Sequence, residues 1–388
     1  MAVKKRNIKK QSGRTTQKKK QKTSVYFDYN LLFVVIFLIC FGLVMLYSSS
    51  SYVAANKFSD SAYYLKEQIK KGVLIGGAGM IFFTKVDYHA WRRFGLFAYV
   101  CSTVLCFAVR IPGLGDSANG SSRWLALGPI RFQPSEIAKI GVIIFLAVIL
   151  ERSAKQLKKG ASLIKIFGML TPLIVSVAIS NLSTGIIILG ICVCMLFVAS
   201  PKYSHFFITA GVCAVGALVL ILLFPYRLGR VTTWLHPDQA TSDEIYQTLQ
   251  GLYAIGSGGL FGKGLGESLQ KMGNVPESQN DMIFTIVCEE LGLFGAISVI
   301  LLFMLLVWRM MVIANNANDL FGSLIVVGVM AHIAIQVVLN IAVVTRTIPN
   351  TGVILPFFSY GGTSYAFLLC EIGLVLSVSK GIRLQSIG

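Results

Sequence analysis

The sequence predicts an all-α, polytopic integral membrane protein of about ten transmembrane helices, with a large extracytoplasmic loop between helices seven and eight. Three observations predict it. The 388 residues are 55% hydrophobic and 13% charged, with a mean hydropathy of +0.70, which is too apolar for a surface in water. The apolar residues form runs close to the length of about 17 to 25 residues that a helix needs to cross a bilayer. Basic residues mark alternate connections between these runs.

Ten apolar runs are predicted to cross the membrane as helices, because only a closed ladder of backbone hydrogen bonds is stable in hydrocarbon. They are Leu31–Tyr47, Ile69–Phe83, Phe94–Val109, Pro134–Leu150, Ile164–Ile179, Thr184–Ala199, Phe206–Phe224, Met282–Trp308, Leu320–Val344 and Val353–Val378. Residues 30–388 are therefore expected to form one ten-helix transmembrane domain.

Residues 1–29 are predicted to be a basic, disordered cytoplasmic tail. Many of the bases behind the formal charge of +18 lie between Lys4 and Lys22, directly before an apolar run. Such a tail is typical of a juxtamembrane segment attracted to anionic lipid heads, so we expect no nucleic-acid partner. Because basic short loops stay in the cytoplasm, both termini are predicted to be cytoplasmic in a multi-pass protein of the bacterial cytoplasmic membrane.

Three connections on the predicted outer side are more than simple links: residues 110–133, 225–281 and 346–352. The longest carries the glycine run Gly256–Gly259 and ends in polar residues before helix eight. A connection of more than about 15 residues in a compact protein is usually functional. The chemistry is therefore expected on this side of the membrane.

Asp281 stands where the long outer loop enters helix eight. One interpretation is an ordinary helix N-cap, a position that aspartate often fills. The other is a partly desolvated carboxylate at the membrane rim, whose pKa would be raised and which could act as a base. The local pattern leaves both interpretations open.

Glu289 and Glu290 lie about two turns further along the same helix, on the order of 12 Å into the bilayer. Charged groups at that depth face a cavity or a partner, and they mark either a functional site or a structural ion pair. Lys139, Arg346 or an amide of a neighbouring helix are the candidate partners.

The outer end of helix four is a candidate anion site. Pro134 suits the first helical position, and Gln133 and Ser135 flank it. Glu136 and Lys139 are three residues apart and hence neighbours on one helix face. With Arg123 and Arg131 just upstream, this helix start could hold a diphosphate, or the charges could form an ordinary interfacial pair.

Two further polar features interrupt the apolar helices. His332, Gln336 and Asn340 form a stripe at spacings of four on helix nine, which favours hydrogen bonds between helices over a cavity lining. In helix ten, proline and paired glycines in Pro356–Gly362 break the span near its outer end. Broken helices are tolerated where they line a cavity, so this segment is predicted to wall the site.

Four motifs follow one another along the chain in the order that one known family has. They are Arg123-Trp124 with Phe132–Glu136, Gly256–Gly259 through Gly262–Gly266, Asp281–Phe284 with Glu289–Gly292, and Pro356–Gly362. With them the chain resembles the SEDS family of bacterial shape, elongation, division and sporulation proteins, which includes FtsW, RodA and SpoVE. The resemblance covers nearly the whole chain after the tail. The long basic tail and Asn340–Thr345 favour the FtsW and SpoVE branch over RodA.

The resemblance implies a peptidoglycan glycosyltransferase that polymerises lipid II, an undecaprenyl-diphosphate-linked disaccharide peptide, at the outer face of the membrane for cell division. Asp281 matches the family's essential aspartate and is the expected catalytic residue. The expected substrate-binding residues are Arg123, Gln133, Ser135, Glu136, Lys139, Lys263, Glu277, Gln279, Ser359, Tyr360, Gly361 and Gly362. A class B penicillin-binding protein transpeptidase and other divisome membrane proteins are the expected partners.

Two positions depart from the family pattern. The chain has Asn181-Leu182-Ser183-Thr184 where the family often has Asp-Leu-Gly-Thr, and Gln279 stands near a position where histidine is common. Asn181 supplies no carboxylate, so a catalytic role carried over to that position is in doubt.

The expected reaction inverts the sugar configuration, if the phosphate bond is α and the product β, so one base suffices. Asp281 is the predicted base, and Arg123, Lys139 and Lys263 are predicted to stabilise the departing diphosphate. A divalent cation, Mg²⁺ or Mn²⁺, bridging the diphosphate stays open as the one expected cofactor. The sequence itself offers no metal ligand set.

Other functions also fit parts of the pattern. Polar, broken helices suit a transporter that flips the lipid-linked precursor, although the sequence has no visible repeat symmetry. A RodA-type elongation polymerase and a non-catalytic scaffold of a division complex are the remaining alternatives.

Overall fold

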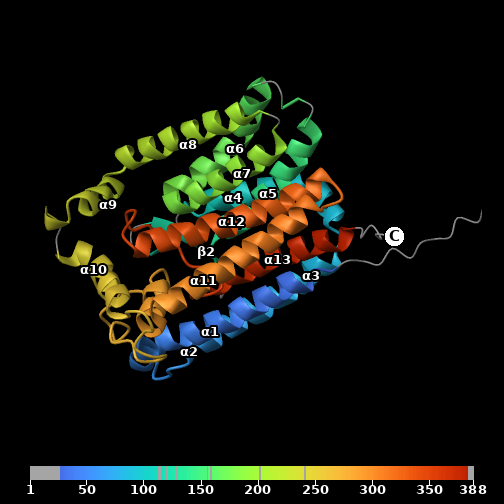
Figure 1. The fold of residues 1–388 in the computed structure, drawn as a ribbon. Coiled ribbons are helices and arrows are strands. Elements are labelled where there is room, and N and C mark those ends of the chain that lie inside the picture. Colours follow the sequence, from blue (N-terminus) through green and yellow to red (C-terminus); the bar gives the residue numbers. More distant parts are fainter. Residues whose placement is uncertain are drawn as a thin grey trace, which may run out of the picture.

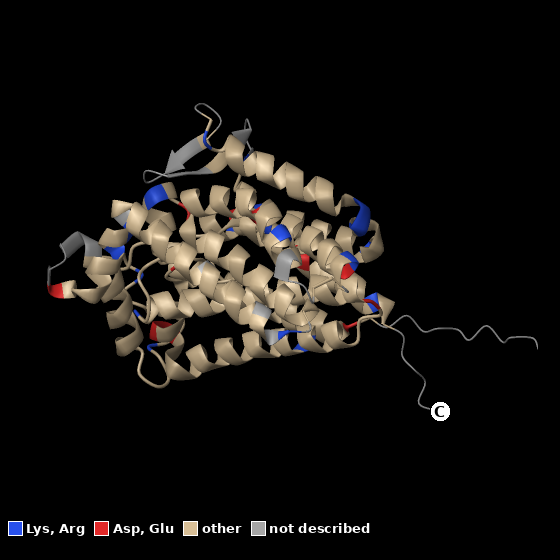
Figure 2. Ribbon diagram, turned by 90° about the horizontal axis from the view of Figure 1, so that it is seen from above, with Lys and Arg blue, Asp and Glu red and all other residues tan. Residues whose placement is uncertain are grey.

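The computed structural model describes residues 27–111, 115–118, 121–127, 130–154, 156–157, 160–200, 202–239 and 242–382. The predicted tail lies outside the described residues up to residue 26. Figure 1 shows a bundle of long helices that run back and forth between two ends. Figure 2 shows charged residues sparse along these helices, as expected of segments that lie in lipid.

Each of the ten predicted spans overlaps a helical segment. The segments are α1 (Tyr29–Phe58), α2 (Tyr63–Glu67) continued by the π-helix η1 (Gln68–Leu74) and α3 (Ile75–Lys85), α4 (Trp91–Ala108), α5 (Pro134–Ser153), α6 (Gly160–Ser180), α7 (Leu182–Ala199), α8 (Tyr203–Leu223), α11 (Ile283–Asn315), α12 (Leu320–Val344) and α13 (Gly362–Gly381). Within the described residues, seven helices are long and apolar enough to cross a membrane. The chain is therefore a helical, multi-pass membrane protein.

Both ends of the described chain lie at the same end of the bundle (Figure 1). The backbone N–H of Asp28, before α1, donates to Ser379 Oγ near the end of α13 at 3.4 Å. The Asp28 carboxylate also pairs with Arg309 in the last part of α11 at 2.5 Å. We call this the terminal end, and the opposite end, where α9 and α10 lie, the outer end.

The fold is not purely helical, and the all-α prediction is wrong in one segment. Between α4 and α5, the strands β1 (Gly115–Ala118), β2 (Ser121–Leu127) and β3 (Ile130–Phe132) form a three-stranded antiparallel sheet. Leu125 pairs with Phe132 across β2 and β3, and the chain then enters α5 with Pro134 in its first turn, as predicted. These strands are too short to form the long apolar runs from which the spans were predicted.

The long connection between α8 and α11 contains helices of its own. It begins with α9 (Pro225–Leu235) and the short 3-10 helix η3 (Pro237–Gln239), and α10 (Ser242–Ser257) then packs against α11. Turns follow from 258 to 282. One glycine there is required: Gly262 has a φ of 81°, and a Cβ would lie 2.1 Å from the carbonyl oxygen of Glu290.

The last helix begins later than predicted. Residues 353–361 are not helical, and α13 starts at Gly362. Pro356 has no N–H to donate to a helix ladder, which accounts for the break. The side chain of Gln68 in η1 holds the segment in place, since it accepts from the Gly361 N–H at 3.1 Å and donates to the Ser359 carbonyl at 3.4 Å.

Candidate functional site

A cavity of about 800 Å³ opens among the helices at the outer end. Its wall comes from β2 and β3, α5, α7, α9, α12, the turn before α11 and the segment before α13. The lining side chains that carry charge are Lys71, Arg131, Glu136, Lys139, Arg230, Glu277 and Asp281. An apolar bundle thus holds a polar chamber with four cationic and three acidic groups.

Asp281 lies in the last turn before α11, where α12 holds its backbone. Asn340 Nδ2 donates to the carbonyl oxygens of both Asp281 and Val353, each at 2.7 Å. The N-cap of α11 is Met282, so the interpretation of Asp281 as a cap is wrong. The position is therefore fixed by the neighbouring helix rather than by capping.

The Asp281 carboxylate is buried, with 9% of the residue exposed, and it faces the cavity. Among the described residues, no lysine, arginine or histidine forms an ion pair with it. Burial raises the pKa of Asp281 from 3.8 to about 6, and the Glu277 carboxylate adds to this increase while Arg230 opposes it. This is the raised pKa that the sequence suggested for a base.

Glu136 and Lys139 form the predicted pair on α5, with 3.0 Å between Oε2 and Nζ. Both side chains are buried and line the cavity. Lys139 Nζ also lies 2.8 Å from Nε2 of His332 on α12. The pair is thus part of a contact between helices as well as of the cavity wall.

The polar stripe on α12 bonds neighbouring elements; the predicted bond between helices is confirmed for His332, while Gln336 and Asn340 bond non-helical segments. His332 Nδ1 lies 2.6 Å from Oε2 of Glu371 on α13, and Gln336 Nε2 donates to the Ile354 carbonyl at 3.0 Å. With the two bonds of Asn340, all three residues join α12 to other elements. Gln336 in addition lines the cavity.

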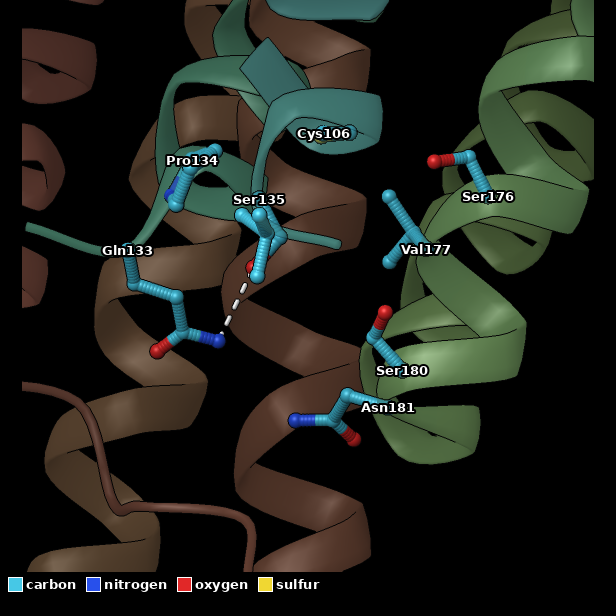
Figure 3. A pocket seen from close by; sticks show the side chains of 9 residues that line it. Cys106, Gln133, Pro134, Ser135, Ser176, Val177, Ser180 and Asn181 are labelled. Carbon is cyan, nitrogen blue, oxygen red and sulfur yellow. Dashed lines mark hydrogen bonds between the residues drawn. The ribbon is translucent and has the colours of Figure 1, made fainter. Parts of the chain in front are cut away.

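Gln133 and Ser135 occupy the start of α5. Gln133 lines the cavity, and its Nε2 donates to Ser135 Oγ at 2.9 Å. Figure 3 shows this bond in a smaller pocket, across which lie Ser180 and Asn181. Ser135 lines this smaller pocket and not the main cavity. Arg123 belongs to β2, and its side chain lies outside the described part of the structure.

The segment before α13 walls the cavity as predicted, with Tyr360, Gly361 and Gly362 in its lining. Ser359 is different, because its buried Oγ accepts from the Leu355 N–H at 2.8 Å and lies outside that lining. Gln279 is also buried, and its backbone carbonyl accepts from the Tyr360 N–H at 2.8 Å. Ser359 and Gln279 therefore shape the wall without lining it.

Glu277 lines the cavity four residues before Asp281. It has a φ of 56°, an uncommon conformation for a residue with a side chain, and its carboxylate accepts a hydrogen bond from Asn280. The strained turn places two carboxylates on the same chamber.

The structure contradicts two predictions: that Lys263 binds substrate in the cavity, and that Lys139 or Arg346 pairs with Glu289 or Glu290. Lys263 lies outside the cavity lining and pairs with Glu289 at 2.7 Å. Glu290 pairs with Lys271 at 2.8 Å and accepts from Ser48 Oγ at 2.7 Å. The suggested partners Lys139 and Arg346 are wrong, because the turns after α10 fold back over α11 and bring their own lysines.

Several residues of the site were not singled out in the sequence. Lys71 and Arg230 line the cavity, and Glu371 contacts the histidine of α12. Glu371 had a readable signal, a carboxylate inside an apolar run. Lys71 and Arg230 had none, because a lysine near a span end and an arginine in an outer loop are both common.

Asn181, the residue that departs from the family pattern, caps α7. Its Oδ1 accepts from the Thr184 N–H at 3.2 Å, and it lines the cavity. The amide at this position therefore performs the capping role.

A metal would need several oxygen or nitrogen ligands in one place. Among the described residues, no group of three histidine, cysteine, aspartate or glutamate side chains is positioned to hold a metal ion. The cavity turn offers two carboxylates, of which Glu277 is already bonded to Asn280. These described residues do not form a metal site on their own.

Comparison with known proteins places this fold and cavity in a family. Residues 29–383 match the model of the FtsW, RodA and SpoVE family, described as cell cycle protein. The chain is 40% identical over 361 residues to stage V sporulation protein E of Bacillus subtilis, covering 92% of this chain and 98% of that one. It is 36% identical over 359 residues to a probable peptidoglycan glycosyltransferase FtsW of Geobacter sp. strain M18, with the same coverage.

Solved structures agree. The rod shape determining protein RodA of Thermus thermophilus superposes with a TM-score of 0.68 at 25% identity, over 92% of this chain and 98% of that one. A chain from a structure titled as a peptidoglycan synthase complex that coordinates polymerization and crosslinking shares the fold, with a TM-score of 0.75 at 24% identity over 91% and 97% of the chains. The chain belongs to the FtsW/RodA/SpoVE family of cell cycle proteins.

Proposed function

We propose that this protein is a peptidoglycan glycosyltransferase that polymerises lipid II at the outer face of the cytoplasmic membrane, in division or sporulation. The relatives named FtsW and SpoVE support this activity and this role. The observation that carries the proposal is Asp281: a buried carboxylate with its pKa raised to about 6, on a cavity of about 800 Å³ with four cationic side chains.

The reaction follows from these groups. A sugar hydroxyl of the acceptor attacks the anomeric carbon of the donor, the new C–O bond forms, and the bond to the lipid diphosphate breaks. Asp281 takes the hydroxyl proton, and the diphosphate leaves with the electron pair. Because one displacement inverts the configuration, a single base is sufficient.

The cations of the cavity suit the leaving group. Lys139, Arg131 and Arg230 line the chamber together with Lys71, and negative charge that develops on the departing diphosphate would be stabilised there in a site of low dielectric. Lys263 does not have this role, because it pairs with Glu289 and lies outside the cavity lining.

The proposal includes a membrane arrangement of ten crossings with both termini in the cytoplasm. In this arrangement the outer end faces outside, and the cavity would lie on the side where lipid-linked sugars are polymerised. Residues 225–281, with α9 and α10, then form the extracytoplasmic loop between helices seven and eight. A class B penicillin-binding protein is the proposed partner, in line with the peptidoglycan synthase complex, one chain of which shares this fold.

The test is polymerisation of labelled lipid II by the purified full chain, alone and with its transpeptidase partner. Asp281→Asn is expected to lower the rate by about 10² to 10⁴ fold, the typical worth of a positioned base. Asp60→Asn is the control, since Asp60 is a partly exposed carboxylate paired with Lys66 away from the cavity. Retained turnover in Asp281→Asn, or translocation of lipid II without polymer, would overturn the proposal.

A further inference from the structure

A buried charged network lies behind the cavity, and the reaction above leaves two of its members, His332 and Glu371, without a role. The network runs from Glu136 to Lys139 (3.0 Å), to His332 Nε2 (2.8 Å), and from His332 Nδ1 to Glu371 (2.6 Å). The four residues are exposed by 7, 3, 2 and 1%. Only Glu136 and Lys139 reach the cavity.

The contacts of His332 Nε2 are incompatible with a single protonation state. Nε2 lies 2.8 Å from Lys139 Nζ, which can only donate, and 2.8 Å from Gln336 Oε1, which can only accept. The Gln336 amide is oriented by its Nε2, which donates to Ile354. A neutral His332 with its proton on Nδ1 satisfies Lys139, and a charged His332 satisfies Gln336.

Charge balance favours a proton on His332 when more negative charge arrives. The network holds two carboxylates and one lysine, and buried charges are stable when they are paired. A protonated His332 between Lys139 and Glu371 makes the two signs equal. An anion bound in the cavity would then find Lys139 turned toward it, because the imidazolium repels the ammonium.

We propose that His332 and Glu371 are a positioning pair whose protonation releases Lys139 from α12 toward the cavity, so that binding of the substrate's diphosphate is coupled to proton uptake at His332. This inference rests on the proposed function, because the ligand is the diphosphate of that substrate. Imidazole is the side chain whose charge ordinarily changes near neutral pH.

The groups around His332 limit what else could titrate there. From α5 it contacts Lys139, and from α13 it contacts Glu371. Glu136 and Tyr365 line the small pocket that His332 also lines. Of the other long helices packed on α12, α7 carries only Cys192 and Cys194 as titratable groups.

The remaining neighbours are α10, whose titratable residues are Asp243, Glu244, Tyr246 and Tyr253, and α11. The α11 carboxylates near the cavity are committed elsewhere. Glu289 and Glu290 pair with Lys263 and Lys271. A pH response of ligand binding that depends on His332 therefore has a defined set of partners.

The experiment measures binding of undecaprenyl diphosphate to the full chain in detergent, between about pH 5.5 and about pH 8.5. All variants carry Asp281→Asn, so the Asp281 carboxylate is removed and no turnover is required, while Glu277 is the same in all of them. The test variant adds His332→Gln, which keeps hydrogen-bonding groups and cannot become a cation. The control adds His89→Gln, a histidine at the terminal end that contacts Asp87 and Asp319.

Affinity of the Asp281→Asn protein is expected to rise at low pH by about tenfold more than that of the protein with His332→Gln, while the His89→Gln protein follows the parent. The titration of the ligand itself is common to all three. A merely structural role of His332 would lower affinity equally at every pH and leave the slope unchanged, and that result would overturn the proposal.

Glu371→Gln gives a second readout that remains useful if His332→Gln fails to fold. It keeps the shape of the side chain and removes the anion that stabilises the imidazolium, so the rise in affinity should move to lower pH. An unmoved profile would contradict the pairing. Because binding is measured without turnover, failure of the unsubstituted chain to polymerise lipid II would count against the proposed function and not against this coupling.

Discussion

Buried carboxylates occur in two regions near the outer end, and the protein satisfies them differently. Glu289 and Glu290 are fully buried, each is paired with a lysine, and Ser268, the Leu269 and Gln270 N–H groups and Ser48 fill the remaining acceptor positions. Asp281 is also buried but, among the described residues, has no ion pair and faces a cavity. Burial alone therefore does not mark a functional carboxylate; unused capacity for a proton or ligand does.

The first way to test this comparison is to break a saturated pair. Lys271→Met leaves the Glu290 carboxylate buried without its cation and is expected to lower the free energy of unfolding by about 3 to 5 kcal/mol. The double variant Lys271→Met/Glu290→Gln should recover a large part of the loss. Unfolding in SDS gives the values, and a small loss in the single variant would mean that the pair is dispensable.

The second test removes the unsaturated charge. The folded pKa of Asp281, about 6, lies above its ordinary value of 3.8. The contribution of this carboxyl to the free energy of unfolding is therefore fully present below pH 3.8 and is lost as the pH rises through about 6. Asp281→Asn should therefore stabilise the fold above pH 6, by up to about 3 kcal/mol. SDS unfolding at about pH 5 and about pH 7.5, one value on each side of that pKa, should show the larger gain at the higher pH. A destabilised variant would contradict the idea that burying the Asp281 charge costs stability.

The pH profile of the reaction is a third, smaller effect. A base must be ionised, so the polymerisation rate at saturating lipid II should fall about tenfold per unit as the pH drops below the pKa of Asp281, about 6. A profile that is flat down to pH 4.5 (roughly a unit and a half below that pKa) would remove Asp281 as the base.

The smallest effect is expected at the surface. Asp60 pairs with Lys66 at 2.8 Å, and this bond lowers the pKa of Asp60. Asp60→Asn should leave the thermal unfolding temperature and the polymerisation rate unchanged, because exposed ion pairs contribute little. A clear loss of activity there would extend the functional region beyond the cavity.

Much of the fold was predictable from the sequence. Every predicted span overlaps a helical segment, because long apolar runs have few other stable forms in a membrane. The sheet of β1, β2 and β3 was missed, since its short strands carry no long apolar pattern. The start of α13 lies nine residues after the predicted start of the span, at 362 rather than 353; the motif Pro356–Gly362 indicated the break, but hydropathy alone does not.

The site was predictable in part. Asp281, Glu136, Lys139, Gln133, Glu277, Tyr360, Gly361 and Gly362 lie on one cavity as the motifs suggested. Ser135, Lys263, Gln279 and Ser359 do not line it. Arg230 and Lys71 were absent from the expectation. Loop residues change partners with small changes in backbone path, and nothing in local sequence records which of several lysines meets which glutamate.

By itself, the sequence determined that this chain lies in a membrane, how its apolar runs alternate, and which family motifs it carries, because those properties depend on composition and on order along one chain. Only the tertiary structure decided which buried charges are spent on each other and which face an open chamber. That distinction depends on distances between residues that are not neighbours in sequence. Lys271 lies beside Glu290 and neutralises it, whereas Asp281 faces a cavity. The first carboxylate stabilises the fold, and the second is available for the reaction.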